Sequence, residues 1–142
     1  FGLEYFDTSD LLSTADFVSL HIPLTPETRH FIGERELRMM KPTSILVNAA
    51  RGGVVDSQAL YTALSEGWIS GAALDVTDPE PILPDDPLLT LENLVITPHI
   101  GSASIASRRH TCLLAARNVV AGIQGIRLEA CANPEVYAAK GI

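Results

Sequence analysis

The chain has 142 residues, of which 10 are basic and 17 acidic, for a formal net charge of −7. Its 46% hydrophobic and 19% charged content excludes a disordered acidic chain. The acidic balance argues against nucleic-acid or membrane partners, since both require a basic surface. No apolar run approaches the ~18–20 residues that cross a bilayer. We therefore expect a soluble, cytoplasmic protein.

The two cysteines cannot specify a disulfide framework, and we expect both to be reduced thiols. Cys112 shares a predicted helix face with Ala116 and is expected to be a small core residue rather than a nucleophile. The cysteines and histidines do not fall at zinc-ligand spacings, so no metal site is predicted.

Four short apolar runs are predicted to be buried strands. They lack the polar alternation of half-exposed strands, which is typical of parallel sheets covered on both faces. They occupy residues 16–22, 44–50, 69–76 and 93–99.

Helical segments separate or follow these runs. A short helix is predicted over 34–40, ending before a proline. Asp56 is a favourable N-cap for the next helix, and Gly67 is a stop signal for it. A long helix is expected from about Ser102 to Gly122, followed by a partly irregular tail.

This alternation predicts an α/β fold with a doubly wound parallel sheet of the Rossmann type. In such sheets ligands bind at the carboxyl ends of the strands. Unusual residues stand at three of these ends. Arg51 follows the second strand, Asp75 lies near the end of the third with Glu80 beyond it, and His99 follows the fourth.

Three of these residues have complementary chemistry. The Arg51 guanidinium can hold a carboxylate with two parallel hydrogen bonds, and His99 can exchange a proton near neutral pH. A carboxylate such as Glu80 would fix the histidine tautomer and favour its protonated form. Together they suit the reduction of a 2-oxo acid, with the hydride supplied from elsewhere.

Each of these residues also has an ordinary structural interpretation, as part of a turn, a solvated loop acid or a structural histidine. The catalytic hypothesis depends on all three sharing one sheet edge. His21 is a weaker candidate that packs or lines a pocket, whereas His30 and His110 are expected at the surface or in packing. The sequence contains no G-x-G-x-x-G, no P-loop and no G-x-S-x-G motif.

Four ordered segments are distinctive: LHIPLTPETRHFIG, MMKPTSILVNAARGGVVD, AALDVTDPEPI and VITPHIG. Together they resemble the D-isomer-specific 2-hydroxyacid dehydrogenases, especially their glyoxylate/hydroxypyruvate reductase branch. The similarity extends over residues 9–137. The resemblance implies an NAD(P)-dependent oxidoreductase that interconverts a 2-oxo acid and a D-2-hydroxy acid. Its catalytic set matches Arg51, Glu80 and His99.

The same resemblance implies contacts with NAD or NADP. Asp75 matches the residue that contacts the nicotinamide amide. The other implied cofactor contacts are Ile22 and Pro23 beside the adenosine, Ala49, Ala50 and Gly101 near the nicotinamide ribose, and Arg51 and His99.

The family's glycine-rich turn, its NAD/NADP-selecting residue and its substrate domain would precede Phe1, and the chain lacks an initiator methionine. We therefore expect an incomplete Rossmann domain without its first βαβ unit. Residues 1–130 would be the C-terminal part of the dinucleotide-binding domain, and 131–142 a tail leading toward the substrate domain. The chain alone is expected to be inactive, and the complete protein to be a homodimer.

Other interpretations remain open. A dinucleotide-sensing, corepressor-like interaction module would need the same fold without turnover. A formate dehydrogenase of the same broad superfamily is disfavoured, because those enzymes have a glutamine at the position of Glu80. A non-catalytic α/β domain is the simplest alternative.

Overall fold

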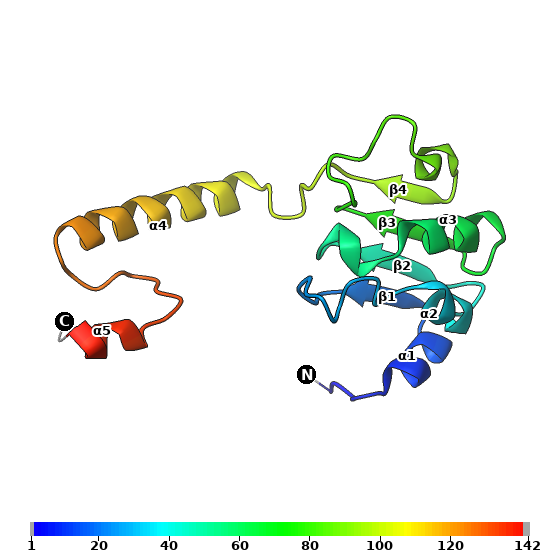
Figure 1. Ribbon diagram of the computed structural model, residues 1–142, viewed down its shortest axis with the longest axis horizontal. Helices are drawn as coiled ribbons and strands as arrows, with labels where there is room; N and C mark the ends of the chain where they lie inside the picture. Colours follow the sequence, from blue (N-terminus) through cyan, green and yellow to red (C-terminus); the bar gives the residue numbers. More distant parts are fainter. Residues whose placement is uncertain (1, 141–142) are drawn as a thin grey trace. The chain divides into compact units, whose positions relative to one another are not determined.

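The computed structural model describes residues 2–140 and forms two compact units that divide between Ile100 and Gly101. The first unit is built on a four-stranded parallel sheet with the order β1-β2-β3-β4 (Figure 1). This confirms the predicted α/β parallel sheet. Its strands are β1 (Phe17–Leu20), β2 (Ile45–Asn48), β3 (Gly71–Leu74) and β4 (Leu94–Ile96).

Three helices accompany the sheet in this unit: α1 (Thr8–Thr14), α2 (Glu34–Met39) and α3 (Ser57–Ser65). The predictions of α2 and α3 are confirmed, whereas α1 is an addition to the predicted elements. Short 3₁₀ turns, η1 (Gly52–Val54) and η2 (Pro87–Thr90), follow β2 and precede β4.

One face of the sheet carries the core. Val18, Leu46 and Leu74 are each at most 5% exposed, and they belong to one buried cluster with Leu37 of α2 and Leu60 of α3. The strands alternate with a period of two, so their neighbours point to the other face.

That other face is open within residues 2–100, where Phe17 is 70% exposed. Within this unit the helices therefore cover one face of the sheet, and cover of the second face stays a prediction. The physical reason is the strand order, which runs along the chain without reversal. Right-handed connections then place their helices on the same side of the sheet.

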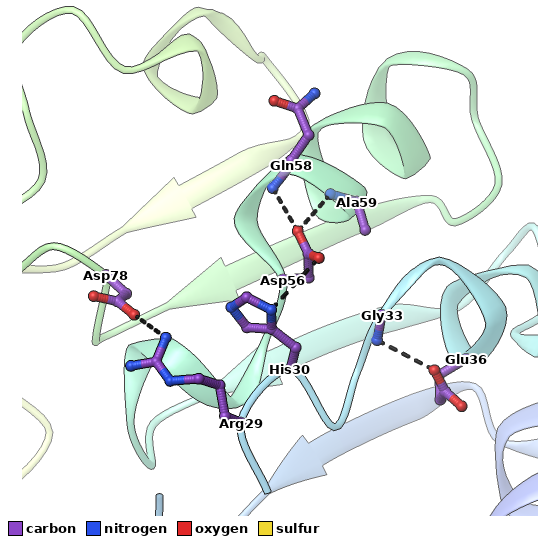
Figure 2. Close-up of polar contacts among 8 residues, drawn as sticks. All are labelled: Arg29, His30, Gly33, Glu36, Asp56, Gln58, Ala59 and Asp78. Carbon is purple, nitrogen blue, oxygen red and sulfur yellow. Dashed lines mark hydrogen bonds and ion pairs between the residues drawn. The ribbon is translucent and has the colours of Figure 1, made fainter. Parts of the chain in front are cut away.

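Asp56 links the start of α3 to the loop that precedes α2. Its Oδ1 accepts hydrogen bonds from the backbone N–H groups of Gln58 and Ala59, both at 3.0 Å, which confirms the predicted N-cap of α3. Its Oδ2 lies 3.7 Å from Nδ1 of His30 (Figure 2). At the other end of α3, Gly67 has a φ of +71°, the left-handed conformation that terminates helices.

Asp56→Ala should lower the free energy of unfolding by about 1 kcal/mol, because α3 loses an N-cap. Asp56→Asn should retain most of the stability, since its amide oxygen can still accept the bonds. Urea unfolding of both variants, with the exposed Asp85→Ala as control, measures the effect. Equal stability of Asp56→Ala and wild type would show that the cap is energetically unimportant.

The second unit contains α4 (Ile105–Ile123) and α5 (Glu135–Lys140). Ser104 caps α4 by accepting a hydrogen bond from the Ser107 N–H at 3.0 Å, which places the start of the predicted long helix slightly later than expected. The tail, predicted to be partly irregular, contains α5 as an additional element.

The predicted core position of Cys112 is wrong. The residue is exposed, and Ala121 is the buried residue of α4 among the described residues. Both cysteines are free, as predicted. Within residues 2–140, no helix combines the length and apolar character that spanning a bilayer requires.

Candidate functional site

The four strands are parallel, so their carboxyl ends meet at one edge of the sheet. Arg51 follows β2, Asp75 directly follows β3, and His99 lies shortly after β4. Glu80 lies in the loop after β3, between Pro79 and Pro81. The structure therefore places these residues at or shortly after successive strand ends, as the sequence predicts.

His99 and Glu80 form a direct pair. Nδ1 of His99 lies 2.5 Å from Oε1 of Glu80, and the two side chains are 48% and 42% exposed. A carboxylate at this distance accepts the Nδ1–H and fixes the orientation of the ring. The other ring nitrogen, Nε2, then remains for a ligand.

A hollow of about 470 Å³ adjoins this pair. Its polar groups come from Asp75, Glu80 and His99 and from two threonines, Thr77 and Thr97. Its remaining lining is apolar or proline, and a pocket of this mixed kind suits a small organic ligand. The apolar and proline members are Pro81, Ile82, Leu89, Ile96 and Pro98.

Arg51 lines a second hollow, of about 750 Å³, after β1 and β2. The structure brings Arg51 together there with four of the predicted cofactor residues. His21 also lines it, and its Nε2 lies 2.9 Å from Oγ of Ser19. Gly101, another predicted cofactor residue, belongs to the second unit. The other lining residues of the hollow are Ile22, Pro23, Leu24, Ala49 and Ala50.

Asn48 shapes the turn that carries Arg51. Its side chain is 1% exposed, and its Nδ2 donates to the Arg51 carbonyl at 3.0 Å while its Oδ1 accepts from the Ala50 N–H at 3.1 Å. The guanidinium donates from Nη1 to the Ala50 carbonyl at 2.7 Å. Sequence reasoning missed Asn48, although an amide at the end of an apolar strand was a usable signal.

The Arg51 turn packs against the loop that carries Glu80. A Cβ on Gly52 would lie only 2.0 Å from the Thr77 carbonyl oxygen, so the two backbones touch. Beside them, Nη1 of Arg29 lies 3.1 Å from Oδ2 of Asp78 (Figure 2). Three loops at the strand ends therefore meet. Close approach explains the need for glycine at position 52.

Gly52→Ala should destabilise the protein by about 1–3 kcal/mol, the usual cost of overpacking. The added methyl group meets a backbone carbonyl, which cannot rotate away. Gly122→Ala is the matched control, because its Cβ would meet only Leu128 at an ordinary 3.8 Å. Thermal unfolding of both variants measures the difference. A Gly52→Ala midpoint equal to that of wild type would contradict the close approach.

The remaining histidines have other environments. His30 pairs with Asp56, and His110 is exposed on α4. Among residues 2–140, no three His, Cys, Asp or Glu side chains are grouped so that they could hold a metal ion.

Three proteins are similar to this chain over most of its length. "Glyoxylate reductase" of Korarchaeum cryptofilum is 57% identical over 124 residues, which is 87% of this chain and 37% of that protein. The crystal structure of the TT0316 protein from Thermus thermophilus has a TM-score of 0.85 at 47% identity, covering 90% of this chain and 42% of that one. D-lactate dehydrogenase with NAD+ from Lactobacillus jensenii has a TM-score of 0.82 at 33% identity, covering 88% and 42%.

The chain thus spans about two fifths of the length of these relatives. Residues 1–101 match the family described as "D-isomer specific 2-hydroxyacid dehydrogenase, NAD binding domain". The match covers most of the chain, and it includes all four strands and the residues at their carboxyl ends. The sheet, the similar folds and this match agree, and the chain belongs to the family of D-isomer-specific 2-hydroxyacid dehydrogenases.

Proposed function

We propose that the protein carrying this chain is an NAD(P)-dependent dehydrogenase that interconverts a small 2-oxo acid, such as glyoxylate or hydroxypyruvate, and its D-2-hydroxy acid. The observation that carries the proposal is the His99–Glu80 pair at the carboxyl edge of the sheet. The similarity to a protein named glyoxylate reductase favours the small substrate. The similarity to a D-lactate dehydrogenase with NAD+ favours the cofactor class.

The residues at the strand ends fit parts of a dinucleotide. The hollow lined by Ile22, Pro23, Ala49 and Ala50 offers small and apolar side chains, which suit the adenosine and the nicotinamide ribose. Asp75 offers a carboxylate suited to an amide N–H. When bound, the nicotinamide supplies or accepts the hydride.

The side chains of this chain have distinct roles in the proposed reduction. Arg51 binds the substrate carboxylate and polarises the carbonyl. The His99 imidazolium donates the proton on Nε2 to the carbonyl oxygen as the hydride reaches the carbonyl carbon. Glu80 accepts a hydrogen bond from Nδ1, which orients the ring. In the oxidation direction, neutral His99 accepts the hydroxyl proton at Nε2.

A corepressor-like module that senses dinucleotides is the alternative. Such a module would need the hollow beside Ala49 and Ala50 but no proton donor. Such a module does not require the close His99–Glu80 pair, so the presence of this pair favours the dehydrogenase.

Three other expectations from the resemblance stay predictions. The first is that the dinucleotide-binding domain extends to about residue 130. The second is that residues 131–142 form a tail leading toward the substrate domain. The third is that the complete protein is a homodimer. The structure is divided between Ile100 and Gly101, and each unit is described by itself.

The test is reduction of glyoxylate and hydroxypyruvate with NADH and NADPH by the full-length protein that carries this chain. Glu80→Gln should lower kcat/KM for reduction by about tenfold or more, because misplacement of a catalytic group is costly. Glu92→Gln, an exposed carboxylate elsewhere, is the control.

Absence of 2-oxo acid reduction by the wild-type protein would overturn the proposed activity. A wild-type kcat/KM in Glu80→Gln would exclude Glu80 as the residue that orients His99.

A further inference from the structure

The backbone of His99 is unusual. Its φ is +54°, in the left-handed region that residues with a Cβ seldom adopt. Such a conformation persists only where the surroundings enforce it, and it often accompanies function. The contacts that hold this segment therefore determine where the imidazole points.

Asp75 holds the segment from both sides. Its Oδ1 accepts a hydrogen bond from the Thr97 hydroxyl at 2.5 Å and another from the Ile100 N–H at 2.8 Å. These two donors flank Pro98 and His99 in the sequence. One carboxylate oxygen thus closes a short loop around the proposed proton donor.

The anchor itself is fixed to the sheet. The Asp75 N–H donates to the Asn48 carbonyl, and the Thr97 N–H donates to the Leu74 carbonyl, both at 2.9 Å. These bonds extend the parallel ladders beyond β3 and β4. Asp75 and Thr97 are both partly buried, so their side chains are less mobile than those of an exposed loop.

We propose that Thr97, through its hydrogen bond to Asp75, is a positioning residue that sets the orientation of His99. The inference rests on the proposed function, because it assigns His99 as the proton donor. The Thr97 hydroxyl also lines the hollow, but it is engaged with Asp75, so its effect on the reaction is transmitted through the loop. Hydrogen bonds to an ionised acceptor are about twice as strong as neutral ones, which suits this role.

Two substitutions separate the hydroxyl group from the shape of the side chain. Thr97→Val keeps the branched shape and loses the donor, whereas Thr97→Ser keeps the donor and loses a methyl group. In the full-length protein, Thr97→Val should lower kcat for 2-oxo acid reduction by about tenfold, because small displacements of a catalytic group are costly. The KM for NADH should stay within about twofold, and Thr97→Ser should restore kcat to within about threefold of wild type.

Thr90→Val is the matched control. The Thr90 hydroxyl donates to the Pro87 carbonyl at 2.7 Å within η2, and its loss should leave kcat unchanged. If Thr97→Val does not fold, Thr97→Ala gives a second deletion of the same hydroxyl. Equal losses of kcat in Thr97→Val and Thr97→Ser would overturn the proposal, as would a wild-type kcat in Thr97→Val or in Thr97→Ala.

A structural measurement distinguishes failure of the inference from failure of the proposed function. NMR signals of the His99 ring and hydrogen exchange of the Ile100 amide can be recorded without substrate. Thr97→Val should shift the ring signals and accelerate the exchange, while Thr97→Ser and Thr90→Val should not. Unchanged signals in Thr97→Val would overturn the positioning role even if the protein is an active dehydrogenase. If the wild-type protein lacks activity while Thr97→Val still shows these changes, the proposed function is overturned and the positioning of the His99 ring is not.

Discussion

His99→Ala should lower kcat/KM for reduction of glyoxylate by on the order of 10²–10⁴-fold, the usual contribution of a general acid. Nδ1 of the ring is held by Glu80 at 2.5 Å, so Nε2 is the nitrogen that can deliver the proton. Alanine removes this donor in both directions of the reaction. The loss should therefore be present at every pH and should also affect oxidation of the 2-hydroxy acid.

Steady-state kinetics of His99→Ala and His110→Ala measure the effect. His110 is an exposed histidine on α4, so its replacement should not change the rate. Binding of NADH should be similar in both variants if His99 acts mainly on the substrate. A His99→Ala protein that retains more than about a tenth of the wild-type kcat/KM would contradict the assignment of the proton donor.

Arg51→Lys should lower kcat/KM by on the order of 10²-fold or more, equivalent to roughly 3 kcal/mol of transition-state stabilisation. The guanidinium already donates from Nη1 to the Ala50 carbonyl, and its other N–H groups remain for a carboxylate. Lysine keeps the charge but has no planar fork, so it cannot hold the backbone and the substrate in the same geometry.

Arg35→Lys is the control, because Arg35 is an exposed arginine on α2. Comparison of kcat and KM for glyoxylate then separates binding from chemistry. A change below about threefold in kcat/KM of Arg51→Lys would exclude Arg51 as the group that orients the 2-oxo acid.

Much of the first unit could be predicted because its local signals agree. The apolar runs around Val18, Leu46, Ala72 and Val95 are short and end near proline, glycine or polar residues, which is typical of buried parallel strands. Parallel pairing then places Arg51 and the residues beyond β3 and β4 at one edge. The pairing of Glu80 with His99 was a hypothesis from their chemistry, and the structure contains it.

The remaining features depend on contacts between distant segments. Nothing local indicates that Phe17 faces away from the core, because the side on which the helices pack follows from the strand order. The exposure of Cys112 likewise depends on what α4 packs against. The contact of Gly52 with Thr77 joins residues that are remote in sequence, and a single glycine does not reveal its neighbour.

The contact between Gly52 and Thr77 has a consequence for engineering. A chimeric dehydrogenase can be planned by exchanging one active-site loop at a time. Here the turn after β2 and the loop after β3 have complementary backbones, and Arg29 and Asp78 bridge the same junction. Residues 51–53 and 77–80 should therefore be transferred together, with position 29 matched to position 78. A graft of either loop alone would combine surfaces that were shaped for different partners.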